Sequence, residues 1–187
     1  MVCAVCLASP GFATTISYHA TADDGFTMYI STSPTVQGTS IGSGNDWSGT
    51  FSGSGALIAG VTNYLQVYGD NSGGNVGGFI GDFTLSDANF QFGNGAQSML
   101  TNAADWFVSE TGYNAAPNVA TDRGQNGAYP WGIISGIDAQ ARWIWTTDSE
   151  GSVAYLSIPI TYVVPLPPAL LLLGSGLLAL AGWRKLF

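Results

Sequence analysis

Phe26-Thr27-Met28-Tyr29-Ile30-Ser31 alternates apolar and polar side chains without interruption. A period of two residues predicts a β-strand that buries one of its faces. The residues just before it, Asp23-Asp24-Gly25, are typical of a turn, and Ile16, Tyr18 and Ala20 alternate in the same way upstream. This stretch therefore predicts a strand, a turn and a second strand, which is the building pattern of a mainly β protein.

Similar signals continue along the chain as far as residue 160. We expect further strands at residues 47–51, 56–61, 64–68, 78–85, 132–134, 142–146 and 153–160, with loops or turns at 38–45, 70–75 and 112–126. Pro159 predicts that the last strand lies at a sheet edge, because proline lacks the N–H that a central strand donates. Seven or more short strands with frequent turns favour an antiparallel β-sandwich or jelly roll.

Residues 96–108 are the exception to this pattern. Their apolar side chains fall near helical spacing, at Met99, Leu100, Ala103, Ala104 and Phe107. Apolar residues that recur every three or four positions predict a helix with one buried face. We therefore expect one short helix within an otherwise β domain that spans residues 14–162.

The composition of this domain is typical of extracellular proteins. Twelve acidic residues stand against two arginines, Arg123 and Arg142, which gives residues 14–162 a formal charge of −10. A surface of that sign repels nucleic acid, so we expect no nucleic-acid partner. Glycine, serine, threonine and asparagine are abundant, whereas lysine and glutamate are scarce, as in extracellular β domains with many turns.

Catalytic motifs are not apparent in the sequence. His19 is the single histidine and lies in an expected strand, and we find no nucleophile elbow, phosphate loop, dinucleotide fingerprint or zinc motif. We therefore expect that this protein is not an enzyme. A secreted hydrolase stays open as an alternative, since a glycosidase needs only two suitably spaced carboxylates.

Calcium is the cofactor that the acidic turns would suit. Asp23, Asp24, Asp70 and Asn71 carry side-chain oxygens in expected turns, and Ca²⁺ prefers such ligands. The alternative is that these residues only shape the turns through their side-chain hydrogen bonds.

Aromatic side chains in loops are candidates for sugar binding, because their apolar faces can stack on sugar rings. Trp47, Tyr129 and Trp131 lie in or beside expected loops and are our candidate ligand residues. Trp143 and Trp145 are two positions apart in an expected strand and so share one of its faces; we assign both to the core or to one side of a sheet surface.

The first 13 residues resemble the second half of a signal peptide. An apolar stretch is followed by Pro10-Gly11 and by the small residue Ala13, a suitable cleavage position. The basic segment that normally opens a signal peptide is missing, so our hypothesis is that translation starts upstream. Both cysteines, Cys3 and Cys6, fall in this segment.

The last segment, residues 163–187, combines a proline motif with an apolar run. Val164-Pro165-Leu166-Pro167 precedes the uncharged residues 169–183, which contain Gly174-Ser175-Gly176, and Arg184-Lys185 follow. As a helix, this run would cover roughly 22 Å, less than the ~30 Å of a bilayer core. We expect a transmembrane-type helix with its C-terminus in the cytoplasm, because basic residues favour that side. An ordinary tail anchor and a buried core helix are the alternatives.

These features together resemble the PEP-CTERM protein-sorting signal, in the variant known as VPLPA-CTERM. The resemblance covers roughly the last 25 residues, with the proline motif, the Gly174-Ser175-Gly176 break and the basic pair Arg184-Lys185 in order. It implies export in a Gram-negative bacterium that makes exopolysaccharide. It also implies transient retention in the inner membrane, recognition by an exosortase-type membrane enzyme, and final delivery to the cell surface or beyond.

The middle domain shows a second resemblance. Ala22-Asp23-Asp24-Gly25-Phe26-Thr27-Met28-Tyr29-Ile30 is similar to the strand that opens galactose-binding-like jelly rolls, and Gly60-Val61-Thr62-Asn63-Tyr64-Leu65-Gln66-Val67 looks like that family's second block. The resemblance implies a jelly roll with a sugar site.

The sequence thus predicts a non-catalytic protein of the cell surface or extracellular matrix that contacts exopolysaccharide. A self-assembling structural protein is the main alternative, with the strand near Pro159 and the glycine-rich faces forming the subunit contacts.

Overall fold

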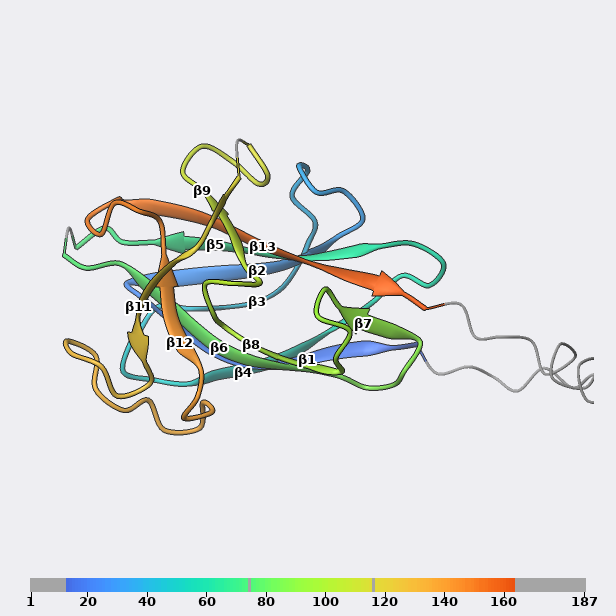
Figure 1. The fold of residues 1–187 in the computed structure, drawn as a ribbon, viewed down its shortest axis with the longest axis horizontal. Helices are drawn as coiled ribbons and strands as arrows, with labels where there is room; N and C mark the ends of the chain where they lie inside the picture. The colour runs from blue at the N-terminus through green and yellow to red at the C-terminus, as the bar shows by residue number, and fades with distance from the viewer. Residues whose placement is uncertain (1–12, 74, 116, 164–187) are drawn as a thin grey trace, which may run out of the picture.

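The computed structural model describes residues 13–163 except residues 74 and 116. Two antiparallel β-sheets pack face to face in a β-sandwich-like arrangement (Figure 1), which confirms the mainly β prediction. Within the described part of the chain, no helix has the length and apolar character needed to cross a membrane. The expected signal peptide and the sorting signal, with its helix, lie outside the described residues.

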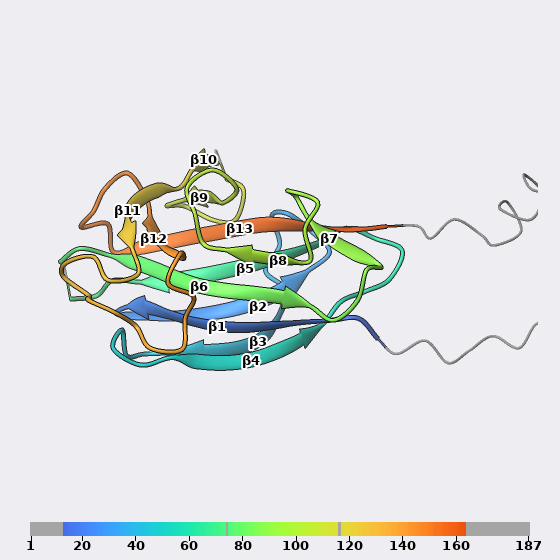
Figure 2. The same ribbon diagram turned by 60° about the horizontal axis from the view of Figure 1, so that its bottom comes forward.

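Sheet A has six strands, and its main path places the first strand of the chain between β6 and the edge strand β4 (Figure 2). The order is β11 (Thr121–Gln125), β12 (Arg142–Trp145), β6 (Gly78–Leu85), β1 (Thr15–Asp23) and β4 (Phe51–Ala56), and β8 (Ser98–Leu100) also pairs with β6.

Sheet B has seven strands. The order is β10 (Asn118–Val119), β9 (Phe107–Ser109), β13 (Val153–Tyr162), β5 (Asn63–Asp70), β2 (Gly25–Ser31) and β3 (Thr39–Gly44), and β7 (Phe90–Phe92) also pairs with β13. The chain passes from sheet A to sheet B at Asp24, the single residue between β1 and β2.

Four of the connections between strands gather at one end of the two sheets. The β1–β2 corner and the β3–β4, β5–β6 and β11–β12 loops all lie there, on the left in Figure 1, and we call this the loop end. The described chain begins and ends at the opposite end. There the Thr14 hydroxyl donates to Asp87, and the Val163 N–H donates to the Asn89 carbonyl.

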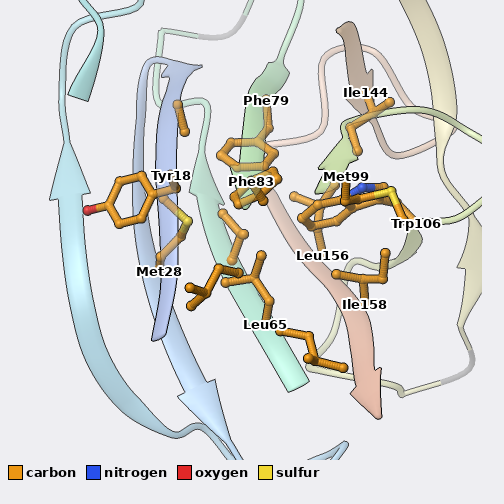
Figure 3. Close-up of a cluster of buried hydrophobic side chains, with 14 of the residues drawn as sticks. Tyr18, Met28, Leu65, Phe79, Phe83, Met99, Trp106, Ile144, Leu156 and Ile158 are labelled. Atoms are coloured by element: carbon orange, nitrogen blue, oxygen red, sulfur yellow. The ribbon is translucent and has the colours of Figure 1, made fainter. Parts of the chain in front are cut away.

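The space between the sheets is filled by the inward side chains of both layers, which we call the inter-sheet core. Phe79 packs against Phe26, Phe83 and Trp106, with ring centroids 5.7, 6.4 and 5.9 Å away. Figure 3 shows the central members, which are Tyr18, Met28, Leu65, Phe79, Phe83, Met99, Trp106, Ile144, Leu156 and Ile158. The alternating residues of β1 and β2 from which the β prediction began face this core.

A second apolar cluster lies on the outer face of sheet A, beneath the long β11–β12 loop. Ile80 follows Phe79 in β6 and points the opposite way, as alternation along a strand requires. This outer cluster consists of Ile80, Trp131, Ile134, Ile137, Ala141 and Trp143. Trp143 belongs to it, whereas Trp145 belongs to the inter-sheet core, so the two tryptophans of β12 are both buried but in different clusters.

The predicted helix at residues 96–108 is wrong. This segment forms β8, a turn and β9, and so crosses from sheet A to sheet B. The turn is closed by Asn102, whose side-chain oxygen accepts from the N–H groups of Ala104 and Asp105. Met99 and Trp106 were read as parts of one helical region, but they reach the core from the two sides of this turn.

Several strand boundaries also differ from the prediction. The expected loop 38–45 contains β3, and the expected loop 112–126 contains β10 and β11. A single strand, Phe51–Ala56, replaces the two expected at 47–51 and 56–61, and residues 132–134 lie in a loop. Two of the missed strands, β3 and β11, are glycine-, serine- or charge-rich strands at sheet edges, where few side chains are buried and alternation carries little signal.

Pro159 does not mark an edge strand. β13 pairs with β5 along one side and with β9 and β7 along the other. Pro159 pairs with Tyr64 of β5, and on the other side it falls between the residues that pair with β9 (Tyr155–Ser157) and those that pair with β7 (Ile160–Tyr162). The missing N–H of Pro159 is therefore accommodated because this residue lies opposite the gap between the two short strands β9 and β7.

Candidate functional site

A pocket of about 380 Å³ opens at the loop end, and we call it the corner pocket. It is lined by Asp23 and Asp24 of the β1–β2 corner, Trp47 of the β3–β4 loop, Asn75 and Val76 of the β5–β6 loop, and Tyr129, Pro130 and Trp131 of the β11–β12 loop. Five of the residues singled out in the sequence therefore converge, although they come from three separate segments. Asn75, Val76 and Pro130 were not predicted, and their nearness in sequence to predicted residues was the only available signal.

The three candidate aromatic residues have different roles in this pocket. Trp131 is only 4% exposed, because one face of its ring stacks on Trp143 at a centroid distance of 4.3 Å. Its Nε1–H donates to Asp23 Oδ2 at 2.7 Å, so Trp131 forms a wall of the pocket rather than an open platform. Trp47 is 39% exposed and Tyr129 is 94% exposed, which leaves their rings accessible to a ligand.

The β11–β12 loop that carries Tyr129 and Trp131 is held in place by polar side chains. The Asn126 amide donates to the carbonyls of Ile134 and Ile137, and its oxygen accepts from the Ile134 N–H. Gly132 follows Trp131 with a φ of 68°, a left-handed conformation that glycine adopts without strain. The loop also docks on sheet A, where the Asp138 N–H donates to Asp82.

The β3–β4 loop that carries Trp47 is fixed from two directions. The buried Thr21 hydroxyl donates to the Asp46 carbonyl at 2.7 Å, and the Thr50 hydroxyl donates to the Ser135 carbonyl of the β11–β12 loop. The Asp46 carboxylate accepts from the hydroxyl and N–H of Ser48, and these bonds hold the pKa of Asp46 below its usual value. Trp47 therefore stands on an ordered turn.

The two carboxylates of the corner differ in their surroundings. Partial burial raises the pKa of Asp23, and the negative charge and hydrogen bonding of Asp24 raise it further, whereas the bond from Trp131 opposes this rise. Asp24 instead ties the corner to the β5–β6 loop: its N–H donates to the Asp70 carbonyl at 2.6 Å, and its carboxylate accepts from the Gly73 N–H.

The other two candidate calcium ligands do not line the corner pocket. Asp70 lines a neighbouring pocket of about 450 Å³ together with Phe26 and Tyr68. Asn71 is buried, and its amide donates to the carbonyls of Asn75 and Gly151, so it shapes the β5–β6 loop. The four residues therefore do not form one site, and the described residues contain no group of three or more His, Cys, Asp or Glu side chains that could hold a metal ion.

The basic side chains of the described residues contact groups outside the corner pocket. Arg142 pairs with Asp122, and Arg123 donates to the carbonyls of Thr146 and Thr147. His19 lies 2.8 Å from Asp82 on the outer face of sheet A. No basic residue stands among those that line the corner pocket, so its charged groups are the carboxylates of Asp23 and Asp24.

No protein-family model, curated protein or solved structure matches this chain. The fold and the pocket define it as a two-sheet antiparallel β protein with an aromatic and acidic pocket at its loop end.

Proposed function

We propose that this chain is a non-catalytic, exported protein of the cell surface or extracellular matrix whose two-sheet domain binds carbohydrate in the corner pocket. The observation that carries the proposal is the meeting of the accessible rings of Trp47 and Tyr129 with the carboxylates of Asp23 and Asp24. A concave site with aromatic walls and a few polar groups is the common design of small-molecule sites. Sugars suit it, since their C–H faces stack on rings while their hydroxyls donate to carboxylates.

The attachment geometry supports presentation at a surface. The described chain begins and ends at the end opposite the corner pocket (Figure 1). β1, with nine residues, runs most of the way between the two ends, and about 3.3 Å per residue makes this roughly 30 Å. If residues 163–187 are an exosortase-type sorting signal, as we propose, a retained tail would leave the pocket facing away from the membrane.

The finer fold assignment belongs to the same proposal. We propose a jelly-roll relationship, supported by the strand–corner–strand unit β1–Asp24–β2, which places the resembling segment at the pocket. The corner residues Asp23 and Asp24 are thereby both fold-forming and ligand-facing.

Glycan-array binding of the purified full chain in mild detergent tests the carbohydrate proposal. We expect binding to at least one class of oligosaccharide, weakened by about tenfold in Trp47→Ala and in Tyr129→Ala, since a stacking ring contributes on the order of 1 kcal/mol. Phe107→Ala is the matched control, because Phe107 is 42% exposed in β9 and does not line the pocket. Equal binding by all three variants would contradict the proposal.

The sorting proposal has its own test, which is the mass of the protein recovered from its native host. We expect the mature protein outside the cytoplasm and shortened within residues 163–187. Intact protein that ends at Phe187 and is dissolved in the cytosol would contradict it.

A self-assembling structural protein remains the second candidate, on a different observation from the one first expected. The edge strands β3 and β4 are rich in glycine and serine and lie on the same side of the two sheets. Unpaired edges can template pairing with another chain. Concentration-dependent polymers without glycan binding, measured by sedimentation, would favour this candidate.

A further inference from the structure

The corner pocket holds two adjacent carboxylates, and no basic side chain of the described residues pairs with either of them. Trp131 donates to Asp23 Oδ2, and the Gly73 N–H donates to the Asp24 carboxylate. Asp23 and Asp24 also hydrogen-bond with each other, whereas both arginines and His19 of the described residues contact other groups. Both residues of the pair are partly buried. Charges in such a position are normally paired or bound to a cation.

The walls around this acid pair are aromatic. Trp47, Tyr129 and Trp131 line the same pocket, and ring faces attract organic cations through their quadrupoles, most strongly where water is excluded. An aromatic lining and unneutralised carboxylates are independent features, and both favour a positively charged group carried on a carbon frame.

We propose that the corner pocket selects a sugar that carries a free, protonated amino group, so that its ligand is an amino-sugar chain rather than a neutral or acidic polysaccharide. This inference rests on the proposed carbohydrate function and narrows its ligand class. The ammonium group contacts Asp23 and Asp24, and the sugar ring lies against Trp47 or Tyr129. Acidic sugars are excluded, since a third negative charge beside the pair is repelled.

A calcium ion fits the pocket less well than an ammonium group does. Ca²⁺ takes six to eight oxygen ligands, whereas the carboxylates that line the pocket are those of Asp23 and Asp24, each already with one oxygen in a hydrogen bond. Three aromatic rings add nothing to calcium coordination but add to the binding of an ammonium.

Calorimetric titration of the full chain compares three tetrasaccharide probes, built from glucosamine, N-acetylglucosamine and glucose, at a pH where the free amine is protonated. We expect the glucosamine tetramer to bind at least about tenfold tighter than the other two. Asp23→Asn and Asp24→Asn should remove this preference, because the affinity for the glucosamine tetramer then falls to about that for the N-acetylated probe. Glu150→Gln is the matched control, because it removes one exposed acid that does not line the pocket.

The outcomes separate this inference from the proposed function. Equal affinity for the three probes leaves the carbohydrate function standing and overturns the amine preference, whereas no binding of any probe overturns both. Binding of Ca²⁺ alone that is lost in Asp24→Asn overturns the inference in favour of a metal site. In Asp23→Asn, the asparagine retains an acceptor oxygen for Trp131. Near-ultraviolet circular dichroism reports whether the Trp131–Trp143 stack survives in this variant. If it does not survive, the probe preference is judged from Asp24→Asn alone.

Discussion

The inter-sheet core and the outer cluster are both apolar, but they are built from different kinds of sequence. The inter-sheet core collects alternating residues of long strands, whereas most of the outer cluster comes from the β11–β12 loop and its junction with β12. Trp143 Nε1, in the outer cluster, is buried without an acceptor among the described residues, while Trp131 Nε1 donates to Asp23. The comparison separates two tasks: one cluster holds the sheets together, and the other supports the wall of the corner pocket.

Phe79→Ala is the strongest way to test the role of the inter-sheet core. Phe79 is fully buried between Phe26, Phe83 and Trp106. We expect a loss of about 3–5 kcal/mol in the free energy of unfolding, because truncation leaves a cavity in a region that cannot collapse. Urea denaturation followed by tryptophan fluorescence measures this loss. A decrease below about 1 kcal/mol would show that the two sheets do not depend on this core.

Trp131→Ala tests whether the outer cluster is the more local unit. We expect a smaller loss, about 2 kcal/mol, since the β11–β12 loop can open without separating the sheets. Sugar binding should disappear, because the variant removes a pocket wall and the donor to Asp23. Hydrogen exchange should rise within residues 126–141 and stay unchanged in β5 and β13; a rise spread over both sheets would contradict the comparison.

Gly78→Ala probes the floor of the outer cluster without removing any contact. A Cβ at Gly78 would lie 2.7 Å from Trp143 and 2.9 Å from Trp131, so both rings must shift. We expect a loss of about 1–2 kcal/mol from this overpacking, together with weaker sugar binding. Gly93→Ala is the control, because its Cβ would meet only Pro159 at 3.9 Å. Equal stability of the two variants would show that the stack is loosely held.

The smallest expected effect is the pH dependence contributed by Asp23. Its pKa is raised in the folded protein, so there is a pH window in which the folded chain holds a proton that the unfolded chain has released. Stability from this group therefore falls as pH rises through that window, by less than about 1 kcal/mol because the carboxyl is partly exposed. Denaturation of wild type and Asp23→Asn between about pH 3 and about pH 7 should show a steeper fall in the wild type.

The pH dependence of stability that Asp46 contributes has the opposite sign but does not disturb this measurement. Hydrogen bonds from Ser48 lower the pKa of Asp46, so its contribution is lost as pH falls through the folded-state value. This contribution is present in both proteins and cancels in their difference. A difference that falls with decreasing pH would contradict the assignment of Asp23.

The sequence predicts well the part of the fold that obeys a simple period. β2, β5, β6, β12 and β13 fall where alternation or apolar runs placed them, because each buries one or both faces. The reliance on a simple period also explains why the helix predicted at residues 96–108 was wrong. Their apolar side chains serve two sheets on either side of a turn, and this spacing imitates one helical face.

The candidate site was predictable by residue type but not by arrangement. Trp47, Tyr129, Trp131, Asp23 and Asp24 were named from loop position and chemistry, and they do line one pocket. Whether a loop tryptophan is open or stacked depends on contacts such as Trp131 with Trp143, between a loop and the strand that follows it. Asn71 was named as a candidate calcium ligand because the sequence does not distinguish a buried amide that shapes a loop from an exposed one.

The position of β13 determines when the molecule can become complete. β13 is the last strand along the described chain, yet it lies inside sheet B, and its pairing with β5 runs from Val153 opposite Asp70 to Ile160 opposite Asn63. Until these residues emerge from the ribosome, β5 has an open edge and the inter-sheet core lacks the side chains that β13 contributes. Contacts so distant in sequence form slowly. The two sheets can therefore close only in a late step, after β13 has been made, and this order of events is compatible with the export proposed above.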